Sequence, residues 1–291
     1  MSKTLLIADS ATDISFEQEE ALGIKILNIP IAINGEPFRD RIDIDSGAFI
    51  ENLDHYKELP KSSQITIYEY YEAYLEAVRA GYDEIITVCI NGKGSGCFSA
   101  AGHAIEALVS ENPAEAAKAK IYVVDSGSYT LAVAWLIPLA VEQLRAGIPA
   151  AEVAGWLQER YSNQETLIGL TNLKYPKLSG RLNSATAVVG DALGIKPVLS
   201  VYKGENTVAD KCRGEKGIVQ KMVELYKKNA ADIQGDYTVG YGTDLKLGED
   251  LAEALTEVSG HPPLSFSQIG PVIALNSGPR MIGMAFPRKP K

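Results

Sequence analysis

The stretch EIITVCINGKGSGCFSAAGHAIEALV, residues 84–109, decides the fold. It begins with an apolar, β-branched run from Glu84 to Ile90 and passes through a loop of glycine and small polar residues from Asn91 to Gly96. It then continues as a small-residue helix from about Phe98 to Val109. A buried strand joined to a helix by a short loop is the repeating unit of a parallel sheet with helices on both faces. We therefore predict an α/β fold.

The same alternation continues on both sides of this stretch. The predicted elements are, in order, strands at Leu5–Ala8 and Ile24–Ile33, a helix from the capping box Thr66-Ile67-Tyr68-Glu69 to Gly81, a strand at Ile121–Val124, and a long apolar helix to about Arg145. They predict an N-terminal parallel-sheet domain over residues 1–164.

The second half of the chain has a different pattern. Its predicted elements are a helix at Ala150–Tyr161, a strand at Thr166–Leu170, a hairpin of Pro197–Tyr202 and Thr207–Lys211, a helix at Glu215–Lys228, a strand at Tyr237–Tyr241, a helix at Leu247–Val258, and short strands at Leu264–Gln268 and Met281–Phe286 that bracket a Gly/Pro/Asn loop. This order predicts a C-terminal α+β domain over residues 165–291.

Composition narrows the possible partners and compartments. The formal charge of −9, from 28 basic and 37 acidic residues, disfavours nucleic acid as a partner. The longest apolar run, Leu131 to Val141, is broken by Pro138 and is too short to span a bilayer. The N-terminus lacks a secretory signal, which favours a cytoplasmic location. The three cysteines and three histidines have no metal-ligand spacing, so we expect no metal and no cofactor.

Three small, hydroxyl-rich loops follow predicted strands: Asp9–Asp13, Gly94–Gly96 and Asp125–Ser128. The carboxyl ends of parallel strands meet at one edge of a sheet, where helix N-termini favour anions. We therefore expect an anion site at this edge, with Asp9, Ser10, Ser95, Asp125 and Ser126 as candidate residues. The alternative is that these residues only cap helices and form turns.

No familiar catalytic motif fits the loop after residue 90. Gly94 stands where a P-loop has Ser or Thr, Cys97 replaces the third glycine of GxGxxG, and Lys93 replaces the first glycine of a nucleophile elbow. A serine hydrolase that uses Ser95 stays open but has no activating histidine in a motif.

Six segments, in the same order along the chain, resemble motifs of the DegV family, which includes the acyl-binding subunit of bacterial fatty acid kinase. They are Asp9-Ser10-Ala11-Thr12-Asp13 (family "DSTSD"), Lys61-Ser62-Ser63-Gln64 ("KTSQP"), Ser95-Gly96-Cys97-Phe98-Ser99-Ala100 ("SGTYQSA"), Val124-Asp125-Ser126 ("VDS"), Ser179-Gly180-Arg181-Leu182 ("GGRI"), and Gly270-Pro271-Val272-Ile273 with Asn276-Ser277-Gly278-Pro279 ("GPVIGTHTGPG"). These segments cover nearly the whole chain.

The resemblance implies two domains with a long-chain fatty acid between them, its tail in an apolar tunnel. It implies a carrier that is not catalytic on its own. At matching positions, Ser95 and Ser62 bind the carboxylate, together with Gly96, Asn276 and Ser277.

Three positions depart from the family pattern. Asn276 replaces a histidine, which keeps a donor but removes a titratable ring. Ser179 replaces the first glycine of "GGR", and Arg280 replaces the glycine after Pro279. Arg181 and Arg280 are candidates for contact with the headgroup or with a partner; the alternative for Arg280 is simple exposure to solvent.

The resemblance also implies a partner, a separate ATP-binding kinase subunit that phosphorylates the presented fatty acid. This chain shows no motif for magnesium or phosphate binding. Residues 196–228 contain eight Lys/Arg and four acidic residues, so this segment is positively charged although the whole chain is negatively charged. This basic segment is a candidate for docking an acidic partner or for transient contact with anionic lipid, unless it is only a solvated surface.

Two other function classes stay open. One is an enzyme that acts on a small anionic substrate through Ser95 or Asp9 in the same cleft. The other is an interaction module that has lost acyl binding. The departures at Asn276 and Arg280 leave this possibility open.

Overall fold

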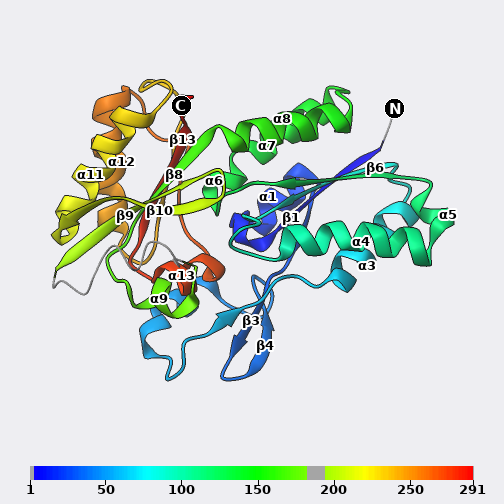
Figure 1. The fold of residues 1–291 in the computed structure, drawn as a ribbon, viewed down its shortest axis with the longest axis horizontal. Helices are drawn as coiled ribbons and strands as arrows, with labels where there is room; N and C mark the ends of the chain where they lie inside the picture. Colours follow the sequence, from blue (N-terminus) through cyan, green and yellow to red (C-terminus); the bar gives the residue numbers. More distant parts are fainter. Residues whose placement is uncertain (1–2, 182–193, 291) are drawn as a thin grey trace.

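A computed structural model describes residues 3–181 and 194–290. Two large sheets lie side by side, each with its own helices, and a small third sheet lies beside them (Figure 1). The four-stranded sheet has the order β2-β1-β6-β7, and its strands are all parallel. Its strands are β1 (Thr4–Asp9), β2 (Lys25–Leu27), β6 (Glu84–Cys89) and β7 (Lys120–Asp125). The predicted N-terminal α/β architecture is confirmed.

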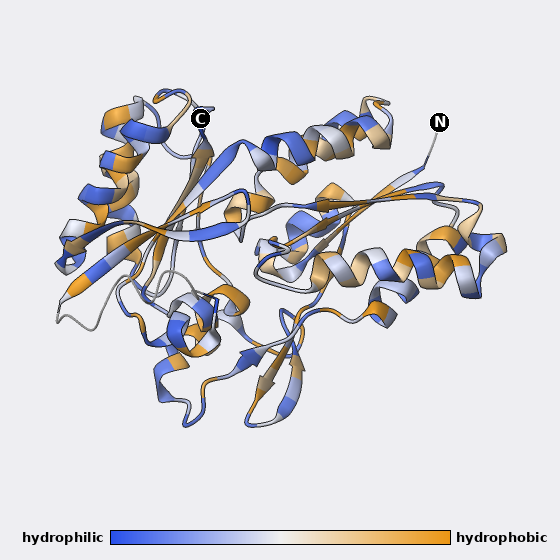
Figure 2. Ribbon diagram, in the orientation of Figure 1, coloured by the Kyte–Doolittle hydropathy of each residue, from blue (hydrophilic) through white to orange (hydrophobic). Residues whose placement is uncertain are grey.

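Helices cover both faces of this parallel sheet. Alternate residues of β1 show why its sequence is apolar throughout: Leu5 and Ile7 pack with one group of helices, and Leu6 and Ala8 with the other. The first group includes α3 (Ile67–Arg79) and α4 (Cys97–Glu111), followed by the short α5 (Pro113–Ala116); the second includes α7 (Leu136–Arg145) and α8 (Ala150–Ser162). Figure 2 shows the strands as largely apolar and the helices as mixed.

The six-stranded sheet has the order β10-β9-β8-β13-β11-β12 and is antiparallel except for the β11–β12 pair. Its strands are β8 (Gln164–Gly169), β9 (Ile195–Tyr202), β10 (Glu205–Arg213), β11 (Thr238–Tyr241), β12 (Ser265–Gln268) and β13 (Ile282–Pro287). Helices α11 (Gly214–Asn229) and α12 (Leu245–Ser259) cover one face. On the other face, Ile168, Leu199 and Val201 join the core of the N-terminal domain. The predicted hairpin and the second α+β domain are confirmed; the division at residue 164 stays a proposal, which the start of β8 supports.

The sequence did not reveal the small sheet. The predicted single strand at Ile24–Ile33 is wrong, because β2 ends at Leu27 and a separate strand begins at Pro30. Proline has no N–H for the ladder and is tolerated as the first residue of a strand. The small sheet has the order β4-β3-β5, with β3 (Pro30–Ile33), β4 (Glu36–Arg39) and β5 (Lys61–Ser62), and α2 (Ser46–Glu51) lies between β4 and β5 in the chain.

The Gly/Pro/Asn loop before the last strand contains a helix, α13 (Pro271–Ser277), so its interpretation as a loop is wrong. Pro271 occupies the first turn, where a missing N–H is harmless. Residues 271–275 are all buried, so the helix has no polar face that would reveal its period. The remaining short elements are α1 (Phe16–Leu22), α6 (Leu131–Ala134), which is separated from α7 at Trp135, α9 (Lys174–Ser179), and the 3-10 turns η1 (Ser10–Thr12) and η2 (Leu53–His55).

Within residues 3–181 and 194–290, no helix combines the length and the apolar character that crossing a membrane requires.

Candidate functional site

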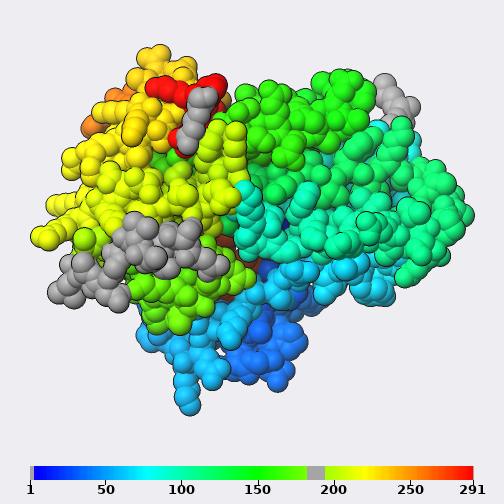
Figure 3. Space-filling model, viewed as in Figure 1, coloured from blue at the N-terminus to red at the C-terminus, as the bar shows by residue number. Residues whose placement is uncertain are grey.

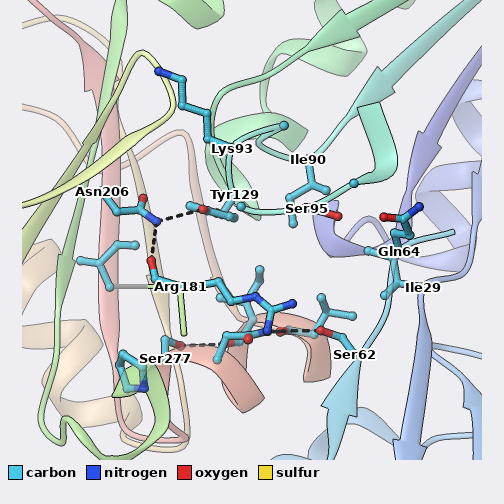
Figure 4. Close-up of a pocket in the computed structure, with 18 of the residues that line it drawn as sticks. Ile29, Ser62, Gln64, Ile90, Lys93, Ser95, Tyr129, Arg181, Asn206 and Ser277 are labelled. Atoms are coloured by element: carbon cyan, nitrogen blue, oxygen red, sulfur yellow. Dashed lines mark hydrogen bonds between the residues drawn. The ribbon is translucent and has the colours of Figure 1, made fainter. Parts of the chain in front are cut away.

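A cavity of about 420 Å³ lies between the two large sheets and takes its walls from both halves of the chain (Figure 4). Its size is typical of a small-molecule site. The described lining residues are Ile29, Ser62, Ser63, Gln64, Ile90, Gly92, Lys93, Gly94, Ser95, Gly96 and Tyr129 from the first half, and Ile168, Leu170, Pro176, Arg181, Leu199, Asn206, Val272, Ile273, Asn276 and Ser277 from the second.

Two serine hydroxyls line the polar part of this cavity. The Ser62 oxygen accepts a hydrogen bond from Asn276 Nδ2 at 3.4 Å, so its own O–H is available to a ligand. The Ser95 oxygen accepts from the Cys97 N–H at 3.3 Å, and its O–H donates only to the weakly accepting Cys97 sulfur. Both hydroxyls are therefore poised to donate to a stronger acceptor.

The start of α4 lies at the same part of the cavity. This helix of 15 residues begins after Gly96, which has no side chain to cap it. Its N-terminal N–H groups and partial positive charge favour an anion there. A Cβ atom at Gly96 would lie 1.6 Å from Gln64 Oε1, and one at Gly94 would lie 2.4 Å from the Tyr129 hydroxyl. The glycines let the backbone form the cavity wall at these two points.

The charged side chains of the described lining are both cationic: Lys93 and Arg181. Figure 4 shows the Arg181 side chain extending across the cavity towards Ser62. Its guanidinium donates to the Ser179 carbonyl oxygen at 2.7 Å, and its own backbone oxygen accepts from Asn206 Nδ2 at 3.0 Å. Lys93 Nζ pairs with Glu205 Oε1 at 2.6 Å, outside the lining, so Arg181 is the lining cation that favours an anionic group in the cavity.

The rest of the wall is aliphatic. Ile168, Leu170 and Leu199 come from the six-stranded sheet and the segment after β8, and Val272 and Ile273 come from α13. Aliphatic side chains form no hydrogen bonds with a ligand and favour only apolar contact. The cavity therefore suits a molecule with an anionic head and an apolar tail.

The two halves of the chain are joined next to the cavity by a buried hydrogen-bonded cluster. Asn91 Nδ2 donates to the Gly204 carbonyl at 3.0 Å and to the Tyr129 hydroxyl at 2.8 Å, and Asn206 Nδ2 donates to the same hydroxyl at 3.1 Å. Burial raises the pKa of Tyr129, so its phenol stays neutral. Figure 3 shows the loop around Lys93 in contact with the hairpin between β9 and β10. The sequence analysis missed this cluster.

The candidates from the loops after β1 and β7 support the site from behind and are not among its lining residues. Asp9 accepts from the N–H groups of Ile90 at 2.6 Å and Ala11 at 3.2 Å, and Ser10 Oγ accepts from the Ile29 N–H at 3.0 Å. Asp125 accepts from the Gly92 N–H, and Ser126 donates within its own turn. Their contacts hold their own turns and tie them to the backbone of neighbouring loops, including the loop that carries Ser95.

Arg280 also lies outside the cavity lining. Its guanidinium pairs with Glu215 Oε2 at 2.9 Å and Asp244 Oδ2 at 2.6 Å, near the N-termini of α11 and α12. Arg280 therefore neither adds a guanidinium to the headgroup site nor blocks it. Ser179, the other departure near the site, lies beside Arg181 as described above.

Ser95 has no group nearby in the lining that would activate it for catalysis. A serine nucleophile needs a general base within hydrogen-bond reach. Neither histidine nor a carboxylate is among the described residues that line the cavity. The described lining therefore offers Ser95 no general base.

Behind the site, three carboxyl groups cluster around η1. Burial raises the pKa of Asp9 to about 7, of Asp13 to about 8 and of Asp40 to about 6, and each carboxyl repels its neighbours. Asp13 accepts from the Gly270 N–H at the start of α13, which carries Asn276. The carboxyl cluster therefore lies next to the junction between the two halves.

Comparison with known proteins was made for the whole chain. The model of the family described as "Uncharacterised protein, DegV family" matches residues 3–289. A DegV domain-containing protein of Clostridium perfringens is 28% identical over 286 residues, with 98% of each chain covered. The crystal structure of a stearic acid-binding protein from Eubacterium ventriosum has a TM-score of 0.85 and 26% identity, with 99% of each chain covered. A DegV family protein of Streptococcus agalactiae shares the fold with a TM-score of 0.87 at 24% identity over the full length of both chains.

The carboxyl cluster predicts how stability depends on pH. A carboxyl has a pKa of about 4 in the unfolded chain, so between pH ~4 and ~8 the folded state binds protons that the unfolded state does not. The free energy of unfolding should therefore fall as pH rises through this window, by at most about 1.4 kcal/mol per pH unit for each such proton. In Asp13→Asn, which keeps an acceptor for Gly270, the fall between pH 6 and pH 8 should be smaller.

Urea unfolding at pH 6 and pH 8 measures this effect. The exposed Asp236→Asn serves as the control and should show the same fall as the parent protein. If Asp13→Asn loses as much stability as the parent, Asp13 does not take part in the titration.

Proposed function

The chain belongs to the DegV family, and we propose that it binds a long-chain fatty acid in the cavity between its two domains and presents the carboxylate to a separate kinase subunit. The observation that carries the binding step is one cavity whose lining combines hydroxyl donors and a guanidinium with aliphatic walls. The Eubacterium ventriosum relative, described as binding stearic acid, supports the ligand class.

The carboxylate would sit against the Ser62 and Ser95 hydroxyls and the N–H groups at Gly96, the start of α4. Asn276 orients Ser62 by donating to its oxygen, and the neighbouring Ser277 is tied to its own helix through the Ile273 carbonyl at 2.8 Å. The Ser277 hydroxyl proton is therefore already used, and in this proposal Ser277 forms part of the cavity wall. Arg181 supplies a positive charge that does not depend on pH.

The tail supplies most of the affinity in this proposal. Each buried methylene contributes about 0.8 kcal/mol, so ~16 carbons offer roughly 10 kcal/mol before the cost of ordering the chain. A charge-assisted hydrogen bond contributes about 1.5–3 kcal/mol. The hydroxyls would therefore decide where the carboxylate lies more than whether the acid binds.

The presentation step rests on the family resemblance and on the chain's own chemistry. Phosphoryl transfer needs a bound metal and a phosphate cradle, which a separate ATP-binding subunit would supply. The basic segment, residues 196–228, lies beside the cavity because its hairpin contributes Asn206 to the lining. Its strand β10 is an edge strand and carries Lys211 and Arg213. This edge is the surface that we propose for the kinase subunit.

The binding step is tested by what the purified protein carries. Organic extraction of the native protein followed by mass spectrometry should release about one fatty acid per chain. Refolded, delipidated protein gives the blank. An empty extract, together with no binding of added fatty acid by the delipidated protein, would contradict the proposal and favour an interaction module.

The presentation step predicts a separation of binding from phosphorylation. Ser95→Ala should weaken fatty acid binding only about tenfold, the loss of one charge-assisted hydrogen bond, because the tail contacts remain. Acyl phosphate formation with saturating acid in a reconstituted kinase assay should fall much further. Ser110→Ala, an exposed serine near the end of α4, is the matched control. A Ser95→Ala protein that supports phosphorylation at the parent rate would contradict the role of Ser95 in presenting the carboxylate.

The kinase surface has its own test. Lys211→Glu combined with Arg213→Glu should weaken affinity for the kinase subunit at least tenfold and leave fatty acid affinity unchanged, because neither side chain lines the cavity. Exposed Lys118→Glu with Lys120→Glu changes net charge equally at the far end of the N-terminal domain. If both pairs weaken the affinity for the kinase subunit equally, net charge alone determines it. If neither pair weakens it, the proposed docking surface is wrong.

A further inference from the structure

The thiol of Cys97 lies directly behind the Ser95 hydroxyl. Cys97 is the first residue of α4, and its side chain is fully buried and is not among the described residues that line the cavity. Its backbone N–H donates to Ser95 Oγ at 3.3 Å, and its sulfur lies 3.2 Å from the same oxygen. A single buried residue therefore holds the Ser95 hydroxyl through two contacts, one from the backbone and one from the side chain.

The same sulfur also contacts the segment that carries Ser62. Hydrogen bonds from the Ile65 backbone and the Tyr70 side chain lower the pKa of the Cys97 thiol, so both groups donate to its sulfur. Ile65 lies three positions after Ser62 in the chain. The sulfur therefore lies where the two serine-bearing segments meet.

The Cys97 thiol keeps its proton in these surroundings. Burial raises the pKa of Cys97 to about 11, and the nearby Asp9 carboxyl acts in the same direction. A protonated thiol has one S–H donor as well as a weakly accepting sulfur. Cys97 can therefore either accept a hydrogen bond from Ser95 or donate one to it.

The Ser95–Cys97 pair has two ways to share its protons. In the structure, the Ser95 O–H points to the Cys97 sulfur. A carboxylate that takes this O–H would leave the Ser95 oxygen with a lone pair for a new donor, and the thiol lies within hydrogen-bond reach of that oxygen. Because sulfur is a weak acceptor, the bond that Ser95 gives up in this exchange costs little.

We propose that Cys97 is a positioning residue for the ligand carboxylate, whose thiol donates to Ser95 Oγ while Ser95 donates to the ligand. The inference rests on the proposed function. A hydroxyl that receives a hydrogen bond is polarised, which strengthens the bond that it donates. We expect this effect to be worth about threefold in affinity for a carboxylate and less for a neutral ester, because charge-assisted bonds are roughly twice as strong as neutral ones.

The ratio of two affinities tests the proposal. Octadecanoic acid and its methyl ester carry a charged and a neutral headgroup on the same tail. In calorimetric titration of delipidated protein, Cys97→Ala should weaken binding of the acid about threefold and leave binding of the ester nearly unchanged. Cys97→Ser keeps a hydrogen-bond donor and should restore the parent ratio. Cys212→Ala, at a cysteine outside the described lining, is the matched control and should change neither affinity.

A double-mutant cycle shows whether Cys97 acts through Ser95. In a Ser95→Ala background, adding Cys97→Ala should weaken binding of the acid no further, because the hydroxyl that the thiol polarises is absent. A threefold loss in that background would contradict the proposal. Equal effects of Cys97→Ala and Cys97→Ser would contradict it too, because they would indicate a role in packing alone.

The parent protein separates this inference from the proposed function. If the parent protein does not bind octadecanoic acid, the proposed function fails, and the positioning role fails with it. If the parent binds the acid and Cys97→Ala leaves the ratio of the two affinities unchanged, only the positioning role is overturned.

Discussion

The close contact between the loop after β6 and the hairpin between β9 and β10 is the constraint on which the cavity depends. Asn91 and Tyr129 from the first half meet Gly204 and Asn206 from the second in one buried set of hydrogen bonds. Breaking these hydrogen bonds while the groups stay buried would cost about 1–3 kcal/mol of stability for each group left unpaired. The contact holds the two halves in register above the ligand space.

This contact is possible only because backbones approach closely. A Cβ atom at Gly127 would lie 3.2 Å from the Gly204 nitrogen, and one at Gly204 would lie 3.0 Å from Asn91 Oδ1. Both glycines also have positive φ, at 56° and 76°, which other residues adopt at a cost. With Gly94 against the Tyr129 hydroxyl, three glycines from separate loops meet at one seam. Inside the cavity, the first half supplies the Ser62 and Ser95 hydroxyls, and the second half supplies much of the aliphatic wall.

The sequence predicted those parts of the molecule in which the determining interactions are local. Strands buried on both faces are apolar throughout, and Ser95 could be placed because a strand, a glycine loop and a helix follow one another directly. Asp9 and Asp125 were less informative, because the same residue types serve ligands and turns alike. Tyr129 gave no signal, since its partner Asn206 lies 77 residues away and has meaning only once the halves are packed. Helix α13 was missed for a related reason, because complete burial removes the polar face by which a helix is recognised.

The two departures from the family motif around α13 have different consequences, although they lie only four positions apart in the chain. Asn276 lies in the cavity, donates to Ser62 and to the Val272 carbonyl, and leaves Oδ1 buried without a partner among the described residues. A carboxamide there orients the serine without adding a charge that varies with pH, so the cationic character of the site comes from Arg181. Arg280 instead points away and joins the N-terminal turns of α11 and α12 through two carboxylates. The departure at Asn276 changes the chemistry of the site, and the departure at Arg280 stabilises the turn that leads from α13 into β13.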